Sequence, residues 1–84
     1  MELKLTKKQY RRLLDMVYIG NWVLNSTRGG DRFTDYDEVE SLLFGQAAAQ
    51  GMPSLAAQGK KEMVPSRAFI EGGIHDAILD YENT

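Results

Sequence analysis

The side chains best suited to chemistry in this chain are a single histidine and a few groups of carboxylates. Glu71 precedes His75 by four residues, so both side chains would lie on one face of a helix. Two ligands at this spacing occur in some metal sites, but two ligands alone do not make a site. A solvated Glu–His pair is the better interpretation, and we therefore expect no metal and no cofactor.

A second group of carboxylates lies in an acidic segment between residues 31 and 40. The five acids are Asp31, Asp35, Asp37, Glu38 and Glu40. Oxygen ligands suit calcium, but Phe33 and Tyr36 interrupt this group and no glutamate closes a twelve-residue calcium loop. Acids are favoured at the start of a helix, where they cap free amides and oppose the helix dipole. The segment therefore predicts a helix start rather than a calcium site.

No arrangement typical of catalysis accompanies these acids. Asp76 and Asp80 would lie on the same short helix as His75, and no nucleophile is marked beside them. The glycine-rich segment 28–32 follows an expected helix rather than a strand, so it predicts a flexible turn and not a phosphate-binding loop. We therefore expect that the protein is not an enzyme.

The first twelve residues contain five basic side chains and one acid, although the whole chain has a net charge of −2. Such a basic surface could contact the phosphates of a small ligand or of a nucleic acid. The cations lack the interleaved aromatic side chains of many nucleic-acid interfaces, so a nucleic-acid partner is not expected. The surface comprises Lys7, Lys8, Arg11 and Arg12, and it supports the alternative function, a small-ligand or nucleic-acid-binding module.

The elements that must position these side chains are helices. Thr6 and Gln9 have the spacing of a capping box, and apolar residues recur at helical spacing after it. Gly29 and Gly30 break that pattern, so the first helix should run from Thr6 to about Asn25. Its buried stripe would consist of Tyr10, Leu13, Leu14, Val17 and Tyr18, while Lys8, Arg11, Arg12 and Asp15 would project to the opposite side.

A second helix follows the glycine-rich turn. Thr34 or Asp35 can serve as its N-cap, and Gly51 can close it, because glycine often ends helices in a left-handed conformation. Residues 52–65 then predict a connection that begins with one short helical turn.

The third helix has two alternative starts. Ser66 is a suitable N-cap, but two adjacent glycines, Gly72 and Gly73, weaken a helix that crosses them, so the helix could instead start at Gly73. Three helices without a strand pattern predict an all-α fold. We expect a compact three-helix bundle, a single helical domain over residues 1–84, with the long first helix at its centre.

The second half of the first helix is apolar nearly all round. Ile19, Trp22 and Val23 lie on the side that carries charged residues one or two turns earlier, so this half needs cover on both sides. Either the other two helices cover these residues, or a second copy of the chain does. Gly20 would allow another helix to approach closely in both cases. We predict an interface at these three residues and a homo-oligomer, with a dimer favoured.

Charges at the helix ends add a prediction about tertiary structure. The cations at the start of the first helix, and Asp80 and Glu82 at the end of the third, all lie at the end of the helix dipole that disfavours them. They would offset each other if the two ends met. We therefore expect these ends to lie close together, either within the chain or across a dimer.

The first helix and the acidic helix start carry a resemblance to a known group of proteins. The matching residues are Tyr10, Leu13, Leu14, Val17, Tyr18, Gly20 and Trp22, followed by Asp35-Tyr36-Asp37-Glu38. In this pattern the chain resembles a group of uncharacterised bacterial proteins that tend to be longer at the C-terminus. The resemblance covers about the first 45 residues. It implies a shortened relative of the kind found on mobile gene cassettes, with no activity or site residue to carry over.

Composition narrows the class of protein. The chain has no cysteine, which fits a reducing cytoplasm, and its N-terminal segment lacks the apolar core of a signal peptide. No run approaches the roughly 18 apolar residues of a membrane span, so no membrane is expected. We therefore predict a small cytoplasmic protein, a non-catalytic interaction or structural module that associates with itself.

Overall fold

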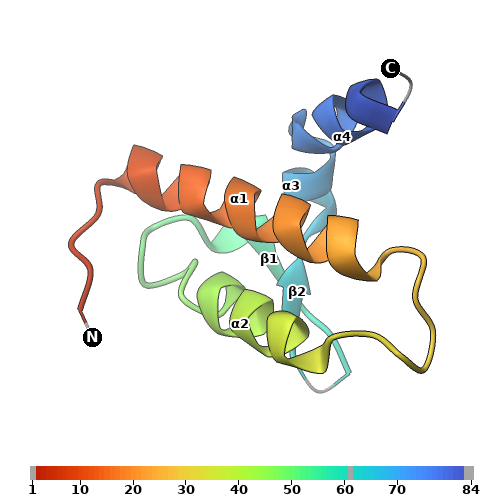
Figure 1. Ribbon diagram of the computed structural model, residues 1–84. Coiled ribbons are helices and arrows are strands. Elements are labelled where there is room, and N and C mark those ends of the chain that lie inside the picture. Colours follow the sequence, from red (N-terminus) through yellow and green to blue (C-terminus); the bar gives the residue numbers. More distant parts are fainter. Residues whose placement is uncertain (1, 61, 83–84) are drawn as a thin grey trace.

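A computed structural model describes residues 2–60 and 62–82. Within these residues the chain forms helices and one β-hairpin, so the fold is mixed and the prediction of an all-α three-helix bundle was wrong. Figure 1 shows the arrangement. In chain order the elements are α1 (Lys7–Asn25), α2 (Thr34–Phe44), the 3₁₀ turn η1 (Pro53–Leu55), β1 (Ala56–Gln58), β2 (Met63–Pro65), α3 (Arg67–Ile70) and α4 (Ile74–Glu82).

α1 has the start and the end that the sequence predicts. The Gln9 amide donates to Thr6 Oγ1 at 3.1 Å, and the Thr6 amide donates to Gln9 Oε1 at 3.0 Å, which confirms the capping box. These bonds satisfy two of the amides that a helix start otherwise leaves free. The buried apolar side chains of α1 are Tyr10, Leu14 and Tyr18.

α2 is shorter than predicted. It ends at Phe44, and the residues after it form a series of turns. Gly51 nevertheless closes this segment as expected, with a φ of +79°. Its amide donates to Ala48 O at 3.0 Å, and the amide of Met52 donates to Ala47 O at 2.8 Å. These two bonds form a Schellman motif, which requires the left-handed backbone that glycine adopts without strain.

The start of α2 is held by another helix rather than by its own cap. Phe33 occupies the N-cap position without a side-chain hydrogen bond, so the predicted caps at Thr34 and Asp35 were wrong. The Asn25 side chain at the end of α1 instead accepts a hydrogen bond from the Phe33 amide at 2.7 Å and donates to its carbonyl at 3.1 Å. A tertiary contact thus replaces the local cap.

The β-hairpin occupies the segment that the sequence predicts to be a connection. β1 and β2 pair antiparallel, with Ala57 opposite Val64. Strands of three residues, one of them Ala-Ala-Gln, have low β propensity and no alternating pattern, so nothing local marks them. β2 also contacts α2, where the Met63 amide donates to Ser41 Oγ at 3.2 Å. The short helical turn expected before the hairpin is present as η1.

The predicted third helix is broken into α3 and α4. Ser66 Oγ accepts a hydrogen bond from the Phe69 amide at 3.2 Å, which confirms Ser66 as an N-cap. The chain then turns at Gly72 and Gly73, and Gly73 has a φ of +113°, which other residues rarely adopt. α3 begins directly after Ser66 and α4 begins directly after Gly73, so a helix follows each of the two predicted starts. No single helix crosses the two glycines.

The core lies where α1, α2 and α3 meet. Leu14, Phe44 and Phe69 are fully buried, and the rings of the two phenylalanines pack edge to face with centroids 4.9 Å apart. In Figure 1, α2 lies on one side of α1 and α4 lies above the C-terminal half of α1.

The end of α4 lies away from the start of α1 (Figure 1). The predicted meeting of these two ends therefore does not occur within the chain. The side chain of Glu82, one of the two acids in that prediction, lies outside the described residues.

Candidate functional site

The three residues predicted to form an interface have different environments. Ile19 and Trp22 are half-buried and pack against the core, and the Trp22 ring lies 6.2 Å from the ring of His75 in α4. Val23 is 59% exposed. The protein's own C-terminal helix therefore covers part of the predicted patch, and Val23 remains on the surface.

Val23 belongs to a wider apolar surface on α1, which we call the outer face. Its members recur at heptad spacing and are Leu13, Met16, Val17, Gly20, Val23 and Leu24. Met16 is 71% exposed, the space around Gly20 is open, and the other members are exposed or half-buried. Leu13 and Val17 were predicted to lie in the buried stripe, but they are half-buried and line a second apolar side of the helix.

The predicted basic surface is partly neutralised. Arg11 and Arg12 both form ion pairs with Asp15, the latter at 2.7 Å, and the Arg11 guanidinium also lies 4.3 Å from the centre of the Phe69 ring. Asp15 is only 4% exposed, so the expectation that it projects away from the buried stripe was wrong. Lys7 and Lys8 are exposed. Two of the four cations in the predicted phosphate-binding surface are therefore paired with a carboxylate of the same helix.

The predicted pair between Glu71 and His75 does not form. Glu71 pairs instead with Arg67 at 3.0 Å, and His75 Nδ1 shares a hydrogen bond of 3.0 Å with the Tyr18 hydroxyl. Among the described residues, no group of three or more histidine, cysteine, aspartate or glutamate side chains could hold a metal ion. His75 therefore helps to fix α4 against α1.

A chain of buried amides links α1 to α2. Asn25 and Asn21 are 2% and 6% exposed, although both lie in a helix of mainly apolar residues. Asn25 Nδ2 donates to Asn21 Oδ1 at 2.6 Å. Asn21 Nδ2 in turn donates to Asp37 Oδ1 at 3.0 Å and to Glu40 Oε2 at 2.9 Å. One neutral amide thus holds two carboxylates of α2 in place.

The two carboxylates have opposite electrostatic environments. The Arg32 guanidinium donates to both oxygens of Asp37 at 2.7 Å, and these hydrogen bonds lower the pKa of Asp37. Burial raises the pKa of Glu40, and the hydrogen bond from Asn21 only partly opposes this effect. The charge of Asp37 is therefore balanced by Arg32, whereas the charge of Glu40 is partly removed from water and has no ion pair among the described residues.

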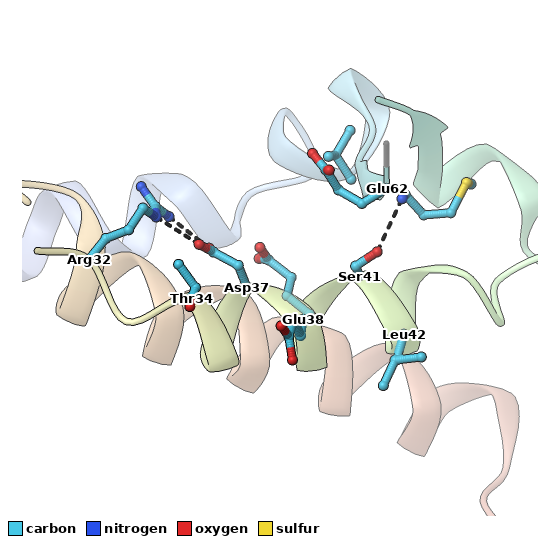
Figure 2. Close-up of a pocket in the computed structure, with 10 residues that line it drawn as sticks. Arg32, Thr34, Asp37, Glu38, Ser41, Leu42 and Glu62 are labelled. Atoms are coloured by element: carbon cyan, nitrogen blue, oxygen red, sulfur yellow. Dashed lines mark hydrogen bonds and ion pairs between the residues drawn. The ribbon is translucent and has the colours of Figure 1, made fainter. Parts of the chain in front are cut away.

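Figure 2 shows an open groove of about 850 Å³ between α2 and the β-hairpin, which we call the α2–hairpin groove. Its charged lining residues are Arg32, Asp37, Glu38, Glu40 and Glu62. Its apolar lining residues are Leu42, Met63 and Val64. A smaller hollow of about 330 Å³ on the α1 side shares Arg32, Glu40 and Val64 with it. Glu40 therefore borders both hollows.

Asn21, Asn25 and Glu40 were not predicted to be site residues. Two asparagines four residues apart in an otherwise apolar stretch were an available signal, because a buried amide needs a polar partner. Nothing local distinguished Glu40 from its acidic neighbours. Its environment depends on α1 and the hairpin, which are distant in sequence.

Comparisons with protein-family models, with curated proteins and with solved structures found no match. The resemblance to uncharacterised bacterial proteins therefore stays a prediction. Within the described part of the chain, no helix combines the length and the apolar character needed to cross a membrane.

Proposed function

We propose that this protein is a small, non-catalytic interaction module that associates with itself through the outer face of α1. The observation that carries the proposal is the heptad spacing of that face. Leu13 and Gly20 are seven residues apart, as are Met16 and Val23, and the whole face lies outside the buried core cluster. Heptad-spaced apolar residues are the pattern by which two helices pack along a common seam.

The size and exposure of this face support a helix partner. α1 has 19 residues, so it is about 28 Å long and offers several turns for contact. Gly20 lies near the middle with open space beside it, so a second helix can approach closely there. Met16 and Val23 flank this point and are among the most exposed large apolar side chains of the described residues. Burying them against a partner would be favourable.

The position of α4 leaves the outer face free for a partner. α4 contacts α1 through Trp22, and Trp22 lies on the side of α1 nearly opposite Gly20, because successive helical residues are rotated by about 100°. A second copy is the partner that the proposal names, since two identical helices can pair through the same surface. The cysteine-free composition is consistent with action in the cytoplasm.

Two matched valines test the proposal. Val23 on the outer face and Val39 on α2 are 59% and 50% exposed, so Val23→Glu and Val39→Glu make the same change at similarly exposed sites. Sedimentation velocity across a range of protein concentrations should show a dimer for the wild-type protein and for Val39→Glu, and a monomer for Val23→Glu. A wild-type monomer at every concentration would refute self-association. Loss of the dimer in Val39→Glu alone would place the interface elsewhere.

A further inference from the structure

The α2–hairpin groove contains one carboxylate, that of Glu40, which is partly buried and forms no ion pair with a described cation. Arg32 is the one described cation with an electrostatic effect on Glu40. Two of its N–H groups donate to Asp37, so Arg32 pairs with Asp37 and offsets the charge of Glu40 only weakly. Glu40 is left with a hydrogen bond from the neutral amide of Asn21. A partly buried anion in such a setting is stabilised when a cation binds beside it.

The Glu40 carboxylate is also held in a fixed position. Its partner Asn21 is 6% exposed and accepts a hydrogen bond from Asn25, which is 2% exposed and bonded to the Phe33 backbone. This buried chain anchors the carboxylate from the α1 side. A pre-positioned group loses little conformational entropy when a ligand binds, which favours a specific contact over diffuse attraction.

The rest of the groove indicates which kind of cation fits. Its volume of about 850 Å³ is within the range of small-molecule sites, and Met63 and Val64 of β2 provide an apolar wall. Among the described residues, no three metal-ligating side chains are arranged so that they could hold a metal ion, which favours an organic cation here. An organic cation on an aliphatic arm can contact the carboxylate and the apolar wall together.

We propose that the α2–hairpin groove binds a small organic cation, an alkylammonium or alkylguanidinium, with its charged head on Glu40 and its aliphatic arm against Met63 and Val64. This site lies on the hairpin side of α2, and the outer face lies on α1. The proposal is therefore independent of self-association.

The test uses n-butylguanidinium as the probe and n-butylurea as its neutral counterpart of the same shape. Each is titrated into the full chain while amide chemical shifts are followed by NMR. We expect saturable shifts at Ser41 and Met63 with the cation and none with the urea. Glu40→Gln keeps an oxygen that can accept from Asn21 but removes the charge, and it should weaken binding at least tenfold. Glu38→Gln makes the same charge change at another position of the groove and should weaken binding less than twofold.

Several outcomes would overturn the proposal. Equal weakening by the Glu40→Gln and Glu38→Gln variants would show only diffuse attraction to an acidic surface. Equal binding of the urea would show that charge is not recognised, and shifts that never saturate would show that no site exists. If Glu40→Gln does not fold, Glu40→Asp provides the second test. It keeps the charge but withdraws it by one methylene, so a specific site should bind the probe more weakly, whereas a diffuse field would be unaffected. The Val23→Glu variant should bind the probe as the wild-type protein does.

Discussion

Replacing Asn25 by alanine should lower the free energy of unfolding by about 2–4 kcal/mol. The side chain is 2% exposed and makes three hydrogen bonds. It donates to Asn21 Oδ1 at 2.6 Å and to Phe33 O at 3.1 Å, and it accepts from Phe33 N at 2.7 Å. Each bond contributes about 1 kcal/mol net, and a buried group that loses its partner costs about 1–3 kcal/mol. Two of the bonds also hold the start of α2, which has no side-chain cap of its own.

The assay is urea unfolding at one fixed protein concentration, followed by the fluorescence of Trp22. Thr27→Ala is the control, because Thr27 is exposed two residues further along the chain, and it should change stability by less than about 0.5 kcal/mol. Asn25→Asp keeps an acceptor oxygen but loses the amide donor and adds a negative charge to a network that already contains two carboxylates. It should cost at least as much as alanine at neutral pH. If Asn25→Ala were as mild as Thr27→Ala, the buried amides would not hold α1 to α2.

Stability should depend on pH through Glu40 and Asp37 with opposite signs. Burial raises the pKa of Glu40 above its ordinary value of 4.5, so when the pH falls from neutral the native protein binds this proton before the unfolded chain does and becomes more stable. Hydrogen bonds from Arg32 lower the pKa of Asp37 below its ordinary value of 3.8, so its stabilising contribution is lost as the pH falls below that value. The measurement is the urea midpoint at a series of pH values from neutral to acid. The rise in stability as the pH falls should be absent in Glu40→Gln, and the loss of stability at still lower pH should be absent in Asp37→Asn. Profiles that match the wild-type protein in both variants would contradict both assignments. Gly73→Ala should destabilise by about 1–2 kcal/mol, because a φ of +113° strains any residue with a Cβ. Gly20→Ala, on an open helix surface, should stabilise the dilute protein by about 0.5–1 kcal/mol, and an effect of the opposite sign in thermal or urea unfolding would contradict this.

The fold could be predicted wherever a local signal was strong. The capping box at Thr6, the N-cap at Ser66 and the left-handed Gly51 were all found from residue type and spacing. The break at Gly73 was foreseen as one of two alternatives. The hairpin could not be foreseen, because its strands are three residues long and lack alternation.

The candidate site was less predictable than the fold. Counting charges identified the basic start of α1 but not its neutralisation, since Asp15 turns inward and pairs with Arg11 and Arg12. The acidic segment was correctly assigned to a helix start, but its five acids could not be told apart. Glu40 differs from Asp37, the other acid that Asn21 contacts, because Arg32 pairs with Asp37 and because burial raises the pKa of Glu40.

The sequence by itself determined the elements whose hydrogen bonds close within a few residues. A cap, a Schellman turn and a glycine with positive φ depend only on neighbours along the chain, so residue types at short spacing are enough to specify them. The tertiary structure alone decided the start of α2, the pairing of the hairpin and the environment of Glu40. Each depends on a contact between distant segments, such as Asn25 with Phe33 or Ser41 with Met63. The free energy of those contacts comes from burial and desolvation, which exist only once the helices have packed together.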